Sequence, residues 1–127
     1  MSSKLYIQEL HHLHIQWNSA LDFACVEISS FENRLQKIAK ANTAKQILAQ
    51  VEHFQNQFIR QKEVIDVLRH DIHEDAMRIS DTVMKNNTAV EHRMMKVNLV
   101  LKHSMEKFQK IFNELRIEYM RFLGEKF

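Results

Sequence analysis

The sequence of 127 residues contains one Gly and no Pro, and this scarcity excludes most folds that depend on tight turns. β-Sandwiches, β-barrels and doubly wound sheets need many such turns, which use Gly for a positive φ and Pro for a fixed φ. A single Gly also excludes the glycine-rich phosphate loop, the Rossmann fingerprint and the nucleophile elbow, because each motif needs more than one. We therefore expect an all-α protein whose long helices are joined by few connections.

Cysteine and long apolar runs are also scarce. Cys25 is the one cysteine, so no disulfide can form within the chain, which is typical of a reducing compartment. Beside an apolar stripe, Cys25 is expected to be a small buried hydrophobe rather than a nucleophile. No run approaches the roughly 18 apolar residues of a membrane-spanning helix, and residues 1–10 lack the pattern of a secretory signal. The sequence predicts a soluble, cytoplasmic protein that does not associate with membranes.

Charge of one sign is not in large excess, since 18 Lys and Arg side chains face 16 Asp and Glu side chains. The mild basic surplus falls in residues 88–127. Lys102, Lys107 and Lys110 alternate there with Glu106, which is typical of a solvated helix face with i,i+4 pairs. A nucleic-acid interface usually shows basic side chains clustered on one face. We therefore expect no nucleic-acid partner.

Two capping-box motifs divide the chain into three segments of similar length. They are Thr43–Gln46 and Thr88–Glu91, in which the Thr hydroxyl accepts an amide hydrogen bond and the Gln or Glu side chain reaches back. Asn42 and Asn87, which tolerate the left-handed backbone of a helix C-terminus, come just before them, and Gly124 is expected to end the last helix. These signals predict helices over residues 3–41, 44–86 and 89–123 of a single domain, 1–127.

Apolar residues recur at alternating spacings of three and four along each predicted helix, as in the seams of coiled coils. The first seam comprises Ile7, Leu10, His14, Trp17, Leu21, Ala24, Ile28, Phe31, Leu35 and Ile38; the second comprises Ile47, Val51, Phe54, Phe58, Gln61, Ile65, Leu68 and Ile72; and the third comprises Val90, Met94, Val97, Leu101, Ser104, Phe108, Ile111, Leu115, Glu118 and Phe122. After Ile72 the second seam can continue through Asp75 or change phase through Ala76. A neighbouring stripe widens the third seam and comprises Met105, Phe112 and Tyr119. The pattern predicts an antiparallel up-down-up bundle of three long helices with heptad-type packing.

Polar residues interrupt these apolar seams: His14, Gln61, Ser104 and Glu118, together with Asp75 in one phase of the second seam. Folding the chain at the two turns places His14 in one layer with Ser104, and Gln61 within a turn of Glu118. Buried polar side chains usually find partners, and they fix the register of coiled coils. We interpret these residues as core polar groups that set register. The alternative is a ligand or proton site at His14.

Eight histidines raise the question of a metal site. His11, His14 and His73 lie on or beside the predicted inner faces, and three imidazoles can bind Zn²⁺. A carboxylate-bridged di-iron bundle needs Glu-x-x-His on two helices, but only Glu9 and His12 have that spacing, and His12 faces outward. We therefore assign no catalytic, cofactor-binding or metal-ligating residue, and we expect no cofactor.

No motif specifies an activity, and no convergent catalytic set is present, so we expect the protein not to be an enzyme. Apolar residues outside the seams indicate an interaction surface if they lie together; they are Leu5, Ile59, Val67, Met95 and Leu123. The favoured interpretation is a non-enzymatic protein-interaction, scaffold or oligomerisation module, with self-association as a homodimer.

Two alternatives to an interaction module depend on the histidines. The first is a metal- or small-ligand-binding helical bundle that uses the inward cluster His11, His14 and His73. The second is a pH-sensitive switch at His14, because imidazole changes its charge near neutral pH.

Overall fold

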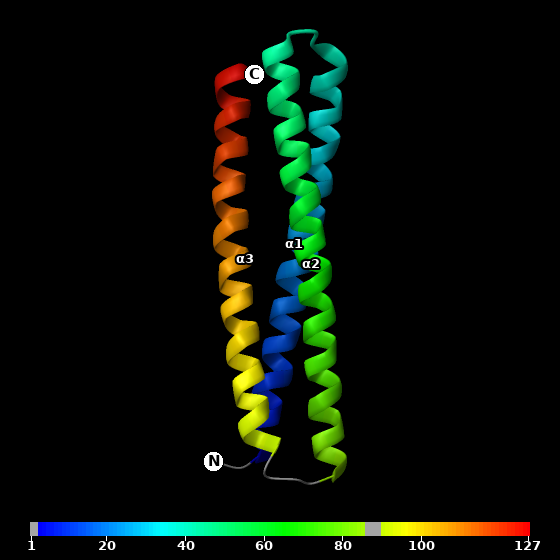
Figure 1. The fold of residues 1–127 in the computed structure, drawn as a ribbon, viewed down its shortest axis with the longest axis vertical. Helices are drawn as coiled ribbons and strands as arrows, with labels where there is room; N and C mark the ends of the chain where they lie inside the picture. The colour runs from blue at the N-terminus through cyan, green and yellow to red at the C-terminus, as the bar shows by residue number, and fades with distance from the viewer. Residues whose placement is uncertain (1–2, 86–89) are drawn as a thin grey trace.

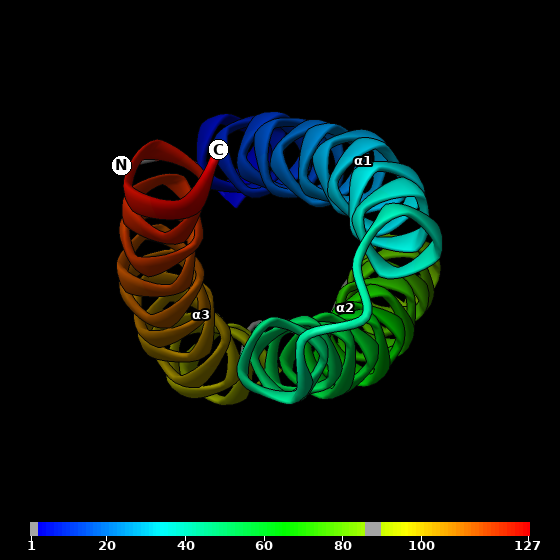
Figure 2. The ribbon, with the colours of Figure 1, turned by 90° about the horizontal axis from the view of Figure 1, so that it is seen from above.

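The computed structural model describes residues 3–85 and 90–127, and within them the side chains of residues 6–81 and 98–127. The chain forms three helices, α1 (Ser3–Ala41), α2 (Lys45–Lys85) and α3 (Val90–Lys126). α1 and α3 run in one direction and α2 runs against them (Figure 1). Seen from above, the helices sweep around a common axis (Figure 2). The predicted all-α, up-down-up bundle of three long helices is confirmed.

In the connection between α1 and α2, the side chain of Asn42 caps the end of α1, and the predicted capping box is not formed. Asn42 Nδ2 donates to the Ile38 carbonyl oxygen over 2.8 Å, so it satisfies one of the carbonyls that the end of a helix leaves free. α2 begins one residue later than expected, and the amide of Leu48 donates to the Ala44 carbonyl over 3.1 Å. Thr43 is exposed and makes no side-chain hydrogen bond among the described residues, so the predicted cap there is wrong. The second predicted capping box begins at Thr88, which, like Asn87, lies outside the described residues.

Gly124 does not end the last helix, so that prediction is also wrong. α3 continues to Lys126, and the Phe127 amide donates to the Leu123 carbonyl over 2.9 Å. The Phe127 ring lies 5.7 Å from the Phe122 ring, centroid to centroid. This contact favours one more helical turn, and Gly124 is an ordinary helical residue within it.

We expect Gly124→Ala to raise the free energy of unfolding by about 0.5–1 kcal/mol. A Cβ atom at Gly124 would meet no atom within 4 Å, and Ala loses less backbone entropy than Gly in a helix. Urea denaturation of the two proteins measures the difference. A loss of stability in the Ala variant would instead place Gly124 at a left-handed helix end.

The buried faces of α1 and α2 follow the predicted seams. Fully buried members include Leu21, Ile28, Leu35, Phe58 and Ile65. Beyond Ile72, the α2 seam continues through Asp75 and Ile79, so it keeps its phase and the alternative through Ala76 is wrong. Cys25 is half-buried and packs against this core, as expected of a small hydrophobe.

α3 buries a face that differs from the predicted seam. Among residues 98–127, its buried residues are Asn98, Leu101, Met105, Phe108, Phe112, Leu115, Tyr119 and Phe122. Ser104 is only partly buried, and Ile111 and Glu118 are exposed, so the prediction that these three lie in the seam is wrong. The neighbouring stripe takes their place, because burying Tyr119 removes much apolar surface from water whereas burying the Glu118 carboxylate costs free energy.

Tyr119 is the centre of an aromatic cluster that joins the three helices. Its ring centroid lies 4.6 Å from that of Phe31 and 5.4 Å from those of Phe54 and Phe58. The hydroxyl donates to the Phe31 carbonyl oxygen over 3.3 Å. Burial raises the pKa of Tyr119 above its ordinary value of 10.0, and the positive charge of Arg34 offsets part of that rise.

The raised pKa of Tyr119 predicts a loss of stability at alkaline pH. Below pH 10.0 the tyrosine is protonated in both the folded and the unfolded chain, so its contribution is constant. Above pH 10.0 the unfolded chain loses the proton first, and the free energy of unfolding falls as the pH rises toward the folded-state pKa. The advantage of the wild type over Tyr119→Phe, measured by urea denaturation, should shrink in this range. An advantage that grows with pH would contradict the raised pKa.

Candidate functional site

The most deeply buried polar contact in the described part of the chain joins His14 of α1 to Asp75 of α2. His14 Nε2 lies 2.7 Å from Asp75 Oδ2, and the two side chains are 6% and 1% exposed. The Trp17 ring lies 5.9 Å from the imidazole, centroid to centroid, and covers one side of the pair. The predicted burial of His14 is confirmed. Its partner is Asp75 rather than Ser104, because a buried imidazole and a buried carboxyl group each need a hydrogen-bond partner.

Asn98 of α3 contributes a third polar side chain near this pair. The contact between His53 and Glu118 shows which residues of α2 and α3 lie at the same level, and this alignment brings Asp75 within about a turn of Asn98. Asp75 Oδ1 and Asn98 Nδ2 are buried and have no hydrogen-bond partner among the described residues. One is an acceptor and the other a donor, so the layer has complementary capacity for a further hydrogen bond. Asn98 lies seven residues before Met105, so extending the stripe of Met105, Phe112 and Tyr119 by one heptad toward the N-terminus would have identified it.

The prediction that Gln61 lies within a turn of Glu118 is wrong, because Glu118 lies level with His53, eight residues before Gln61. Glu118 is exposed, and its Oε1 lies 3.3 Å from His53 Nε2 at the α2/α3 surface. Gln61 is buried at a seam position, as expected, and it lies at the base of the groove between α2 and α3. The difference follows from the phase of α3, which turns Glu118 away from the core.

The three histidines of the proposed inward cluster do not lie together on one buried face. His14 is buried, whereas His11 and His73 are exposed, so the prediction that they point inward is wrong. Each directly follows a seam residue, Leu10 or Ile72, and one residue of helix turns the side chain by about 100°. In the part of the chain that the structure describes, no three His, Cys, Asp or Glu side chains are close enough to hold a metal ion.

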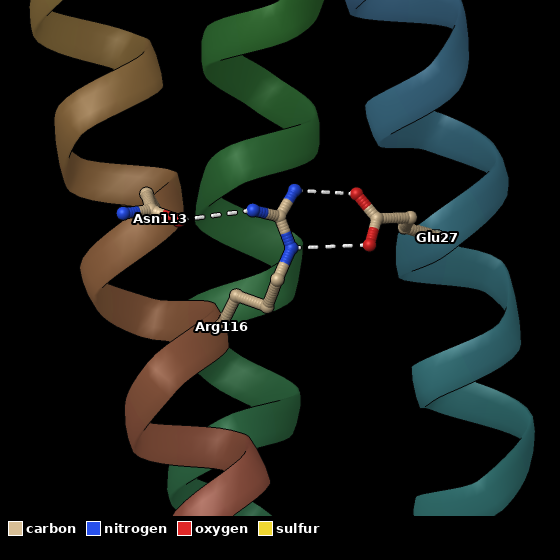
Figure 3. A network of polar contacts seen from close by, with 3 residues as sticks. All are labelled: Glu27, Asn113 and Arg116. Carbon is tan, nitrogen blue, oxygen red and sulfur yellow. Dashed lines mark hydrogen bonds and ion pairs between the residues drawn. The ribbon is translucent and has the colours of Figure 1, made fainter.

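An ion pair with two hydrogen bonds joins α1 to α3, which approach each other less closely than either approaches α2. Arg116 Nε donates to Glu27 Oε2 over 3.1 Å, Arg116 Nη2 donates to Glu27 Oε1, and Arg116 Nη1 donates to Asn113 Oδ1 over 3.1 Å (Figure 3). The guanidinium carbon lies 4.9 Å from the centroid of the Phe112 ring. Two parallel hydrogen bonds between a guanidinium and a carboxylate fix the relative orientation of the two groups. The contact therefore holds α1 and α3 in a defined relative position.

Three grooves between the helices carry large apolar side chains on their walls. The groove between α1 and α3 has a volume of about 570 Å³ and contains Phe23, which is 65% exposed. The groove between α1 and α2, of about 630 Å³, contains Ile59, which is 46% exposed. The groove between α2 and α3, of about 620 Å³, contains Val67, which is 60% exposed, and Ile111. Each groove therefore offers apolar surface to another molecule.

Of the apolar residues expected outside the seams, Ile59 and Val67 are exposed, as an interaction surface requires. Leu123 instead packs against the core, so its expected exposure is wrong. The side chains of Leu5 and Met95 lie outside the described part of the structure. Phe23, the largest exposed apolar side chain in a groove, was missed because one aromatic residue off the seam gives no periodic signal.

Comparisons of the chain with models of protein families, with curated proteins and with solved structures found no match. In the described residues, no helix has an apolar stretch long enough to cross a membrane.

Proposed function

We propose that this protein is a non-enzymatic interaction module of the cytoplasm, which assembles with other protein chains through the grooves between its helices. The observation that carries the proposal is that each of the three grooves described above holds a large apolar side chain more than one third exposed, namely Phe23, Ile59 or Val67. Covering the exposed part of such a side chain, about half of it, contributes about 1 kcal/mol before the costs of association are subtracted. In two of the grooves such side chains gather, Leu48 with Ile59 and Val67 with Ile111, and exposed apolar side chains that gather are typical of interfaces, whereas scattered ones are not.

The interior of the bundle supports the same proposal. The aromatic cluster around Tyr119 and the paired hydrogen bonds between Arg116 and Glu27 hold the three helices in fixed relative positions. A surface that is rigid before binding loses less conformational entropy on association. Grooves with fixed walls therefore favour association with a partner chain.

The test of this proposal is the size of the assembly that contains the chain in extracts of the cells that make it. We expect the wild-type protein to elute in a complex larger than its own 15.2 kDa. A groove variant with Phe23→Gln, Ile59→Gln and Val67→Gln should elute as the free monomer, since Gln keeps helix propensity and removes the apolar contact. A matched control carries Ser19→Gln, Ser30→Gln and Ser80→Gln, at exposed positions, and should retain the complex.

Circular dichroism and thermal unfolding of the three purified proteins establish that each is folded. A wild-type chain that elutes as a monomer from the extract would contradict the proposal. Equal loss of the complex in the groove variant and in the control would contradict the assignment to the grooves.

A second candidate function is the binding of a small polar ligand in the layer of His14, Asp75 and Asn98. The observation that favours it is the pair of unpartnered atoms, Asp75 Oδ1 and Asn98 Nδ2. A molecule with one donor and one acceptor would satisfy both and recover the free energy that they lose on burial. Native mass spectrometry of wild type and Asn98→Leu tests this: bound mass that the variant lacks supports it, and two ligand-free proteins contradict it.

A further inference from the structure

A second stripe of residues runs along α2 beside its seam and faces the α2/α3 groove. Its members, separated alternately by three and four residues, are Gln57, Arg60, Val64, Val67, Asp71 and Glu74; we call them the groove stripe. Five of them line the groove between α2 and α3: Gln57, Arg60, Val64, Val67 and Asp71. A three-four spacing is the pattern by which helices pack lengthwise against one another, so the groove stripe forms a further packing surface.

The groove stripe is self-complementary when read in opposite directions. The midpoint between Val64 and Val67 is also the midpoint between Arg60 and Asp71, and between Gln57 and Glu74. Two antiparallel copies of α2 centred there place Val64 opposite Val67, and Arg60 opposite Asp71 of the second copy. A parallel pair in register would instead oppose Arg60 to itself and Asp71 to itself. Like charges directly opposed destabilise an interface, so the charges select the antiparallel arrangement.

Two charged members of the groove stripe, Arg60 and Asp71, have no partner within the described part of the chain, whereas Glu74 pairs with His70 of the same helix. Arg60 and Asp71 make no ion pair or hydrogen bond there, whereas the other flank of α2 pairs Lys62 with Glu32 and Arg69 with Asp22 of α1. Asp71 is only half-exposed, which makes a partner more valuable to it than to a fully hydrated carboxylate. One flank of α2 therefore satisfies its charges within the bundle, and the opposite flank leaves an acid and a base available.

The groove next to these charges is apolar and has a polar group at its base. Val67 is 60% exposed and Ile111 of α3 is 40% exposed. Gln61 is 4% exposed, lines the groove and makes no side-chain hydrogen bond among the described residues. An apolar centre between opposite charges matches the usual anatomy of a protein interface, in which a desolvated core lies inside a polar rim.

We propose that two copies of this chain associate through their α2/α3 grooves, about a twofold axis that passes between Val64 and Val67. The inference rests on the proposed function and names the partner as a second copy of the chain. The interface is isologous: Arg60 of each copy contacts Asp71 of the other, and the two valines exchange in the same way. Four unpartnered charges are then paired, and two exposed Val67 and two half-buried Val64 side chains are covered.

Light scattering and sedimentation equilibrium of the purified full chain test the dimer. We expect a mass of about twice 15.2 kDa. Arg60→Glu and Asp71→Arg should each raise the dimer dissociation constant by about tenfold or more, because each opposes like charges. The double variant Arg60→Glu/Asp71→Arg restores opposite charges across the axis, and it should recover most of the wild-type affinity. Lys37→Glu, an exposed charge change on α1, is the matched control and should leave the constant unchanged.

Cysteine crosslinking tests the direction of the pairing. In a Cys25→Ala background, Gln57→Cys of one copy should crosslink to Glu74→Cys of another. Neither variant should crosslink to itself, because like positions lie about 25 Å apart along the axis of an antiparallel pair. Circular dichroism identifies any variant that fails to fold. The dissociation constant of the double variant and the yield of the mixed crosslink are interpreted only for proteins that are folded.

Each outcome of these experiments decides the inference separately from the proposed function. A purified chain that is monomeric up to millimolar concentration overturns the homodimer; if the extract still shows a larger complex, the interaction module stands with a different partner. A dimer without charge-swap recovery, or one in which each cysteine variant crosslinks to itself, overturns the twofold axis between Val64 and Val67. A monomer in both the extract and the purified sample overturns both proposals.

Discussion

Replacing His14 with Leu is expected to lower the free energy of unfolding by about 3 kcal/mol, because the Asp75 carboxyl group stays buried without its partner. Asp75→Leu should cost a similar amount, since it leaves the imidazole in the same position. The double variant His14→Leu/Asp75→Leu should recover most of the loss, because two apolar side chains of similar volume can pack between α1 and α2. Urea denaturation of the four proteins measures these differences as a double-mutant cycle.

The cycle has a matched control on the surface of the bundle. His53 and Glu118 form the same kind of contact over 3.3 Å, but their side chains are about half exposed. The equivalent cycle with His53→Leu and Glu118→Leu should give a coupling free energy of about 0.5 kcal/mol or less. If the losses from His14→Leu and Asp75→Leu simply add in the double variant, the two side chains are not coupled and the buried pair is absent.

Tyr119→Ala is expected to lower the free energy of unfolding by about 3–5 kcal/mol, the range for removing a large aromatic side chain from a core. Its ring contacts three other aromatic rings, and its surroundings come from all three helices, so no neighbour can move far to fill the cavity. Glu118→Ala, one residue earlier, should cost about 0.5 kcal/mol or less, because Glu118 is exposed. Thermal or urea unfolding of the two variants compares the costs directly. A larger cost at Glu118 would place α3 in the other phase.

The sequence was sufficient to predict the seams of α1 and α2 because each contains one dominant apolar stripe. On α3, two stripes share Leu101, Phe108, Leu115 and Phe122, and spacing alone does not choose between them. The choice depends on a comparison of free energies: burying Tyr119 is favourable and burying Glu118 is not. That comparison needs only residue types, so the correct phase could have been predicted from the sequence by weighing burial costs as well as spacing.

The polar core illustrates a different limit of sequence reasoning. The spacing of His14 in its seam was enough to predict its burial. His14 is four residues after Leu10 and three before Trp17, so it lies on the same helix face as these two buried residues. Its partner depends on the level of α2 beside α1, which varies with the length of the connection and the coiling of the helices. A side chain one residue away from a seam position can already point to solvent instead of the core. The exposed His11 and His73, which follow the buried Leu10 and Ile72, illustrate this.

The surface grooves depend on how the helices pack against one another, which the periodicity of each helix alone does not describe. Val67 was identified as an apolar residue outside the seam, but its place in a groove beside Ile111 follows from the packing of α2 against α3. The symmetry of Arg60 and Asp71 about Val64 and Val67 is present in the sequence. That symmetry indicates an interface only once the structure places these residues in one groove and shows that Arg60 and Asp71 have no partners among the described residues.

The central claim is that the chain assembles with other protein chains through its grooves, and the size of its native complex tests this most directly. Gel filtration of an extract should place the wild-type chain above 15.2 kDa, and the variant Phe23→Gln/Ile59→Gln/Val67→Gln at the size of the monomer. Elution of the wild type as a monomer, or retention of the complex by the folded groove variant, would contradict the claim.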